Sequence, residues 1–144
     1  MPEPLTPAHA RKSASWKQRV FAWVLHAGNR LMRGVAPQRR NRLFSMLSGR
    51  VLEIGPGAGA NLPYYPRGTT LFGLEPNRYL FRYLREEARR SARTMHLIKG
   101  RAESLGLRGN SIDAVVCTHV LCSVDDLDAT FREILRVLKP GGLF

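Results

Sequence analysis

The chain has 144 residues, enough for one globular domain with a core and too few for two. A hydrophobic fraction of 44% argues against wholesale disorder. No apolar run approaches the roughly 20 residues that cross a bilayer, and the first residues lack the apolar core of a signal peptide. We therefore expect a cytoplasmic protein. The formal charge of +12 can attract nucleic acid, an anionic membrane or an acidic substrate, but no nucleic-acid motif accompanies it, so nucleic acid is not an expected partner.

The N-terminal part predicts a disordered tail over residues 1–14, rich in Pro and Ala, and a helical segment over residues 15–40. Apolar residues of this segment recur at three- and four-residue spacing: Trp16, Val20, Trp23, Val24, Ala27 and Leu31. Cations lie mostly elsewhere on the same helix: Lys17, Arg19, Arg30 and Arg33. Packing of the apolar side over the domain is the favoured interpretation, and a basic amphipathic helix lying on an anionic membrane surface is the alternative. A further helix is predicted over residues 38–47.

From there the pattern alternates between short apolar runs and helical periodicity. Strands are predicted at residues 50–54, 69–74, 95–99 and 111–118, with a fifth beginning at 143–144. Helices are predicted at residues 78–91 and from Asp125 or Asp126 to about Leu138, where Lys139-Pro140-Gly141-Gly142 ends the helix. This alternation predicts an α/β fold with a Rossmann-like, doubly wound, mostly parallel sheet, whose ligands bind at the carboxyl ends of the strands.

The turn after the first strand is the strongest local signal for a ligand. Gly55, Gly57 and Gly59 allow the backbone to approach a ligand without obstruction by Cβ atoms. Glu75 follows Gly55 by 20 positions, at the end of the next strand, where a carboxylate can accept both hydroxyl protons of a ribose. The glycine spacing also fits a dinucleotide site, but Glu53 would repel a pyrophosphate and favours a cationic amino acid part.

Four ordered motifs resemble those of class I S-adenosylmethionine-dependent methyltransferases of the methyltransferase domain 11 type. Residues 51–59 resemble the glycine-rich first motif, Glu75 the acidic ribose residue, residues 100–105 the adenine-side loop, and residues 136–142 the segment before the fifth strand. The resemblance covers residues 41–144 and implies S-adenosyl-L-methionine as the cofactor. Residues 59–61, 64–66, 75–77 and 116–124 are most similar to the methyltransferase-like thiol methyltransferases, which commonly sit on membranes through an N-terminal segment and methylate small lipophilic acceptors.

The resemblance implies a role for each matching residue. Glu53 and the glycine turn would hold the methionine part, Glu75 the ribose, Asn77 would flank the adenosine, and Ala102 with Glu103 would meet the adenine edge. The full cofactor set is Glu53, Gly55, Pro56, Gly57, Gly59, Asn61, Glu75, Pro76, Asn77, Ala102, Glu103 and Thr118. Many such enzymes carry Asp where Arg101 stands, which leaves the adenine contact open.

Thr118 and His119, just past the fourth strand, would face the methyl group as the catalytic residues. A hydroxyl acceptor needs a base, for which His119 is the candidate, whereas a thiolate or free amine needs little more than alignment with the methyl group. A histidine that only hydrogen-bonds at the strand end is an equally good interpretation. Cys117 and Cys122 lie in the same apolar stretch with no spacing typical of a metal site, and we expect both to be buried, reduced thiols.

The resemblance implies methyl transfer to a small, lipophilic thiol or amine. Two alternatives stay open: a phospholipid or quinone methyltransferase peripheral to an anionic membrane, and a noncatalytic cofactor-binding module. A class I domain normally continues beyond a fifth strand, whereas this sequence ends at Phe144, so we expect a truncated product that retains part of the cofactor site without reliable activity.

Overall fold

The computed structural model describes residues 7–32 and 37–144, with side chains from residue 15 to 28 and from 37 onward. Five parallel strands form one sheet in the order β3-β2-β1-β4-β5, which confirms the predicted fold class. The strands are β1 (Arg50–Ile54), β2 (Thr70–Leu74), β3 (Met95–Ile98), β4 (Ile112–Cys117) and β5 (Leu138–Leu143). The α-helices are α1 (Pro7–Met32), α2 (Pro37–Phe44), α3 (Phe81–Arg90) and α4 (Leu127–Val137). Short 3-10 helices lie at η1 (Leu62–Tyr64), η2 (Arg78–Leu80) and η3 (Leu121–Ser123).

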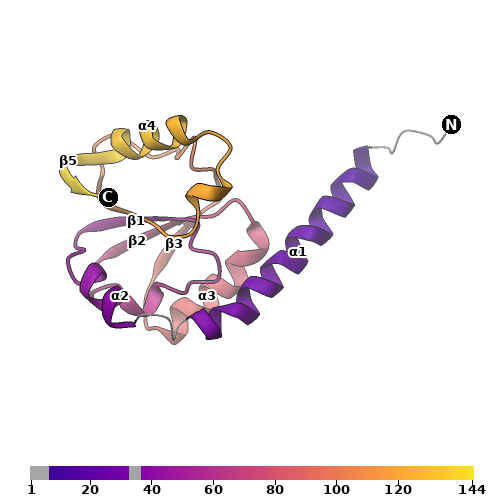
Figure 1. The fold of residues 1–144 in the computed structure, drawn as a ribbon, viewed down its shortest axis with the longest axis horizontal. Coiled ribbons are helices and arrows are strands. Elements are labelled where there is room, and N and C mark those ends of the chain that lie inside the picture. Colours follow the sequence, from indigo (N-terminus) through magenta and orange to yellow (C-terminus); the bar gives the residue numbers. More distant parts are fainter. Residues whose placement is uncertain (1–6, 33–36) are drawn as a thin grey trace.

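Helices cover both faces of the sheet, as Figure 1 shows, with α4 on one side and α2 and α3 on the other. Val51 and Leu71 point toward Phe44 of α2 and Leu84 of α3 in one buried cluster. Successive strand residues point to opposite faces of the sheet. Leu52 and Ile54 of β1 therefore pack with Ile134 and Val137 of α4 in a second cluster. Both faces of β1 are therefore buried, which explains its continuous apolar run.

The strand order reverses between β1 and β4. β2 follows on one side of β1 and β4 on the other, with Ile54 level with both Leu74 and Cys117. The connection from β1 leads to β2 on one side, and the connection from β3 leads back past β1 to β4 on the other side, so the carboxyl ends of β1 and β4 border a crevice. This crevice is where a ligand site is expected.

The last strand begins earlier than its sequence suggests. Lys139-Pro140-Gly141-Gly142, predicted to end the preceding helix, lies within β5, because Leu138 already has an extended backbone (φ −65°, ψ 137°). The register shifts between Ile112 and Ala114 of β4, and Gly141 has φ +76°. A β-bulge between β4 and β5 therefore accommodates the glycines that predicted the end of the helix.

Helix α1 begins at Pro7, so residues 7–14 belong to it rather than to the predicted tail; residues 1–6 lie outside the described residues. The predicted apolar side does not pack on the domain: Trp16, Val20, Trp23 and Val24 are between 40% and 64% exposed, and Ala27 is exposed too. The predicted members Leu31 and Arg30 lie outside the described side chains, and Arg33 outside the described backbone.

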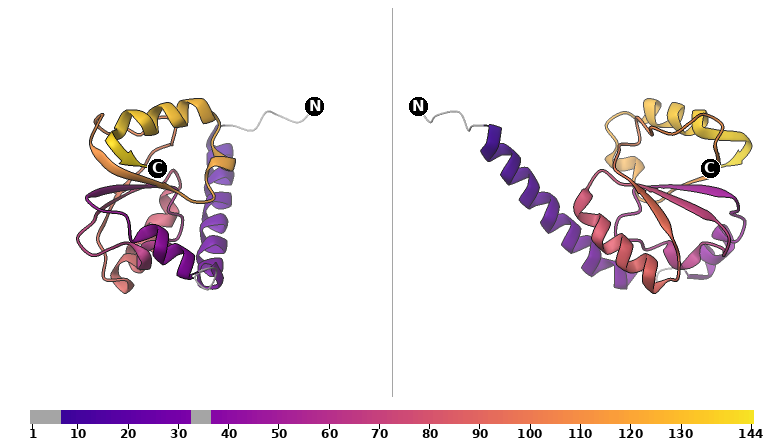
Figure 2. Two further views of the ribbon diagram at one scale, coloured as in Figure 1. Left: turned by 60° about the vertical axis from the view of Figure 1, so that its left-hand side comes forward. Right: turned by 180° about the vertical axis from the view of Figure 1, so that it is seen from behind.

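A different face of α1 holds the helix to the domain. Ala22 is fully buried against Leu80 and Tyr83, the His26 ring stacks on the Tyr83 ring at 4.2 Å, and the Ser15 and Tyr79 hydroxyls are hydrogen-bonded. The small Ala22 side chain lets the helix approach closely, which the hydrophobic periodicity alone does not indicate. Figure 2 shows the helix crossing beside α3 and extending beyond the domain.

The expectation that both cysteines are buried is wrong. Cys122 is exposed and Cys117 half-buried, and both are free thiols. Helix α4 buries Thr130, Ile134 and Val137. Its other apolar residues leave a solvent-facing stripe: Leu127, Phe131 and Leu135.

Candidate functional site

A cavity of about 610 Å³ opens at the carboxyl ends of β1, β2 and β4. Most of the predicted site residues line it: Gly55, Pro56, Gly57, Asn61, Glu75, Pro76, Ala102, Glu103, Thr118 and His119. Three predicted residues, Glu53, Gly59 and Asn77, lie outside the lining. The strands thus bring together residues that are up to 64 positions apart in the chain, from Gly55 to His119. Glu53 and Asn77 support the cavity from behind, as described below.

The glycine-rich turn has the backbone that its composition predicts. Gly55 and Gly57 have φ of +63° and +57°, a region that disfavours other residues. A Cβ atom at Gly55 would lie 2.4 Å from Cγ2 of Val120, so glycine is needed there for the close approach of the β4 loop. At Gly57 the nearest atom to such a Cβ is Leu25 Cδ1 at 4.0 Å, which leaves the backbone open toward the cavity.

Glu75 is fixed at the end of β2 by backbone hydrogen bonds. The Asn77 N–H donates to its Oε1 at 2.9 Å and the Gly57 N–H to its Oε2 at 3.3 Å. Burial raises the pKa of the Glu75 carboxyl above its usual value, and the two N–H donors partly oppose that rise. Its carboxylate therefore joins the glycine turn to the β2 end, with lone pairs left for hydroxyl donors in the cavity.

Glu53 lies behind the turn, only 1% exposed. Asn61 Nδ2 donates to its Oε1 at 2.7 Å and the Tyr65 hydroxyl to its Oε2 at 2.9 Å. Burial raises the pKa of Glu53 to about 7, although both hydrogen bonds and the Arg40 charge lower it. Asn61 lines the cavity and Glu53 does not, and the contact of Glu53 with the cofactor stays a prediction.

Asn77 connects the site to the N-terminal helix. Its Nδ2 donates to the Gln18 carbonyl of α1 at 2.9 Å, and its Oδ1 accepts from the Tyr79 N–H at the start of η2. Asn77 thus lies between Glu75 and α1, and its position beside the adenosine stays a prediction.

Helix α1 also forms a wall of the cavity, which the sequence did not predict. Phe21, Val24, Leu25 and Gly28 line it, all from one side of the helix. Only Val24 belonged to the predicted apolar side, because that side was centred about a third of a turn away. The side of α1 that lines the cavity is determined by the residues that dock the helix on the domain, which hydrophobic periodicity does not identify.

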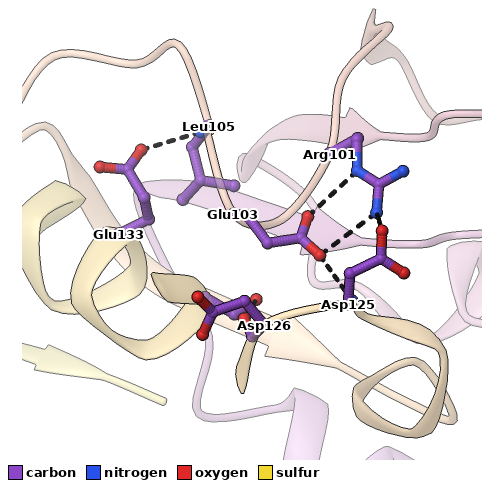
Figure 3. A network of polar contacts seen from close by, with 7 residues as sticks. Arg101, Glu103, Leu105, Asp125, Asp126 and Glu133 are labelled. Atoms are coloured by element: carbon purple, nitrogen blue, oxygen red, sulfur yellow. Dashed lines mark hydrogen bonds and ion pairs between the residues drawn. The ribbon is translucent and has the colours of Figure 1, made fainter. Parts of the chain in front are cut away.

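Arg101 bridges the loop after β3 and the loop before α4, as Figure 3 shows. Its guanidinium pairs with Asp125 and with Glu103, and Glu103 Oε1 also accepts the Asp125 N–H at 2.7 Å. The pKa of Glu103 is lowered to about 2. The causes are hydrogen bonds to its carboxylate from its own backbone N–H and from the Asp125 N–H, together with the hydrogen bond and the positive charge of Arg101. Arg101 and Glu103 line the cavity, so Arg101 holds an acidic side chain at this wall. Asp125 was considered in the sequence only as a helix cap, and Asp126 takes that role by accepting the Ala129 N–H.

Thr118 and His119 lie together where β4 ends. The Thr118 hydroxyl accepts from Asn61 Nδ2 at 2.9 Å. His119 has φ +57°, a strained conformation that tends to occur at functional positions. Both residues line the cavity, so the two predicted catalytic residues share one wall with the glycine turn.

The geometry defines a nucleoside-binding crevice of a Rossmann-like domain, and comparison with known proteins defines the class. Residues 52–144 match the family described as "Methyltransferase domain". The chain belongs to this family of class I methyltransferases, whose methyl donor is S-adenosyl-L-methionine.

Similar proteins and structures agree with this assignment. The chain is 34% identical over 144 residues to thiol S-methyltransferase TMT1B of Homo sapiens, covering 96% of this chain and 52% of the relative. It is 35% identical over 119 residues to thiol S-methyltransferase TMT1A of Homo sapiens, covering 74% and 48%. The chain thus spans about half the length of the curated relatives it matches. A Thermotoga maritima structure described as a SAM-dependent methyltransferase, possible histamine N-methyltransferase, superposes with a TM-score of 0.67 at 27% identity, covering 90% and 59%.

Within the part of the chain that the structure describes, no helix combines the length and apolar character needed to cross a bilayer.

Proposed function

We propose that this chain forms the cofactor-binding part of a methyltransferase that acts on a small, lipophilic thiol or amine. The observation that carries the proposal is the composition of the cavity at the carboxyl ends of β1, β2 and β4. One wall consists of the glycine turn with Glu75, and another consists of apolar side chains from α1 and from the loop after β4.

The residues present fit S-adenosylmethionine. Glu75 offers a buried carboxylate for the ribose hydroxyls, Gly57 leaves its backbone open, and Asn61 Oδ1 is a buried acceptor without a partner among the described residues. When bound, this cofactor supplies an electrophilic methyl group. Glu103 and the Ala102 backbone would bind the adenine, and Pro56 and Pro76 would limit the space around the nucleoside.

The acceptor side of the cavity is predominantly apolar. Phe21, Val24 and Leu25 of α1 line the cavity together with Val120 and Val124 of the loop after β4, and Thr118 and His119 line it where β4 ends. Apolar surface of this kind favours a lipophilic acceptor. The thiol is supported by the names of the similar human proteins, and a thiolate requires alignment more than proton transfer. His119 would hold the proton of a hydroxyl acceptor.

Calorimetric titration with S-adenosylhomocysteine tests the cofactor part, and label transfer from methyl-labelled S-adenosylmethionine to an alkanethiol tests the reaction. An alkylamine and an alcohol of the same chain length are the comparison acceptors. We expect saturable binding that NAD does not compete for, and labelled thioether in excess over labelled ether. Binding without transfer to any acceptor would support the noncatalytic module instead, and absence of binding would contradict the whole proposal.

A second candidate is a phospholipid or quinone methyltransferase at the membrane surface, favoured by the outer face of α1. Trp16, Val20 and Trp23 are exposed on this face, with Lys17 and Arg19 on the same segment. Tryptophan and cations at an exposed helix face favour the interface of an anionic membrane, and the charge of +12 adds attraction.

Replacing Trp16 and Trp23 together by serine is expected to weaken binding to phosphatidylserine-containing vesicles by about 10-fold or more, because burial of each large apolar side chain is lost. Co-sedimentation with vesicles measures the effect. Leu135→Ser is the matched control, because Leu135 is equally exposed but lies on α4, on the other side of the domain. Equal loss in both variants, or no binding by the wild type, would contradict a membrane role for α1.

A further inference from the structure

Helix α1 docks on the domain around η2. Ala22 is fully buried against Leu80 and Tyr83. One turn further along the helix, the His26 ring stacks on the Tyr83 ring at a centroid distance of 4.2 Å. The 3-10 helix against which α1 lies begins directly after Asn77. These contacts form one joint, and the joint determines where the rest of α1 lies relative to the sheet.

Asn77 connects this joint to the ligand site. Its backbone N–H donates to Glu75 Oε1 at 2.9 Å, and its Oδ1 accepts the Tyr79 N–H at 3.1 Å. These two bonds fix Asn77 on the domain. Its Nδ2 donates to the backbone carbonyl of Gln18 on α1 at 2.9 Å. Asn77 is 7% exposed, so its amide would lose this acceptor in a buried position if α1 moved away, which is costly.

The docked helix supplies one wall of the cavity. Phe21, Val24 and Leu25 line the cavity from α1, although each is more than a third exposed. Leu25 reaches the glycine turn, because its Cδ1 lies 4.0 Å from the point where a Cβ atom at Gly57 would lie. These side chains move with the helix, whereas Glu75 and Gly57 lie where the strands end. Undocking of α1 would therefore remove the apolar wall and leave the polar one in place.

We propose that Asn77 is a positioning residue for the acceptor side of the site. By donating to the Gln18 carbonyl it holds α1 in the docked position, and the docked helix provides the apolar wall on which a lipophilic acceptor binds. This inference rests on the proposed function, because it concerns how the acceptor wall of the same cavity is assembled. The task of Asn77 at this joint requires no contact with the cofactor.

The chemistry of the amide explains why an asparagine serves at this joint. A side-chain amide carries both an acceptor oxygen and a donor nitrogen, so Asn77 can accept from Tyr79 and donate to Gln18 at the same time. An aspartate here would have no hydrogen to donate to the carbonyl of α1. Its charge would also lie beside the Glu75 carboxylate, which already binds the neighbouring backbone N–H.

Asn77→Ser tests the link to α1 by hydrogen exchange. The serine oxygen can still accept the Tyr79 N–H, and the backbone N–H that binds Glu75 is unchanged, so the bond to Gln18 is the one that is lost. We expect the amides of residues 15–28 to exchange about 5-fold faster, with exchange in the strands unchanged. Gln18→Ala is the matched control, because it removes an exposed side chain and keeps the carbonyl.

Ala22→Gln tests the acceptor wall, because the longer side chain has no room against Leu80 and keeps α1 from docking. The probes are S-adenosylhomocysteine and octyl methyl sulfide, the thioether that an alkanethiol would yield, with affinities measured by calorimetry. We expect the thioether to bind about 10-fold or more weakly and S-adenosylhomocysteine within about 3-fold of wild type. Ala27→Gln is the matched control, since Ala27 is exposed on the same helix. In the Ala22→Gln background, Asn77→Ser should not change the exchange of α1 further.

Each outcome bears on a different part of the inference. Equal exchange of α1 in the wild type and in Asn77→Ser would overturn the role of Asn77. Equal weakening of the two ligands by Ala22→Gln, or of neither, would overturn the role of α1 as the acceptor wall. Either result, with both ligands bound by the wild type, overturns this inference alone. A wild-type chain that binds neither ligand would overturn the proposed function and this inference with it.

Discussion

Replacing Glu75 by glutamine is expected to weaken the binding of S-adenosylhomocysteine by about 10- to 100-fold, the usual effect of losing a hydrogen bond to a charged group. Both oxygens of Glu75 accept backbone N–H groups, from Asn77 and from Gly57. A glutamine must direct its amide nitrogen toward one of these donors or toward the ribose hydroxyls, so the turn and the ligand compete for a single carbonyl oxygen.

Calorimetric titration of the two proteins at one pH measures this effect. Glu86→Gln is the matched control, because Glu86 is an exposed carboxylate on α3, close in sequence and outside the cavity. The control should keep the wild-type affinity. If Glu75→Gln also binds as the wild type does, Glu75 is not the ribose acceptor.

The second large effect is a decrease in the free energy of unfolding as the pH rises from 4.5 to above 7, by about 3 kcal/mol from Glu53 alone. The pKa of Glu53 is raised from 4.5 to about 7 in the folded chain, chiefly by burial. Between these values the folded state binds more protons than the unfolded state, so stability is greatest below pH 4.5 with respect to this group and is lost as the pH passes 7.

Urea unfolding of the wild type and of Glu53→Gln at pH 5 and pH 8 measures this difference. The variant should lose much less stability across the interval, because its side chain does not ionise. The raised pKa of Glu75 acts in the same direction in both proteins and therefore cancels from the comparison. Parallel losses in the two proteins would show that Glu53 ionises without the expected cost.

The sheet could be predicted because its signals are local. The apolar run at β1, the glycines after it and the alternation with helices each depend on neighbouring residues, and the parallel arrangement then places Gly55, Glu75 and Thr118 at one edge. The start of β5 differs from its prediction because local and tertiary effects compete there. At residues 139–142, pairing with β4 prevails over the tendency of Pro and Gly to end an element.

The parts of the site that were missed depend on tertiary contacts. Helix α1 turns toward the domain through Ala22 and His26, although its largest apolar side chains lie elsewhere, because small and stacking side chains fit closely against Tyr83. Glu53 lies behind the cavity lining, because the turn that follows β1 brings Asn61 to the lining and Asn61 donates to Glu53 from there. The bridge from Arg101 to Asp125 joins loops whose proximity no sequence spacing indicates.

Helix α1 presents three different surroundings within a few residues: the cavity at Phe21, the domain at Ala22 and solvent at Trp23. Each residue turns the helix by about 100°. An insertion or deletion of one residue before Phe21 would not rotate residues 21–23 relative to the domain. An insertion or deletion within residues 21–23 would move the following side chains to different surroundings. Length variation within this helix is therefore as restricted as in a coiled coil, while the identity of the solvent-facing residues can vary with whatever the protein contacts.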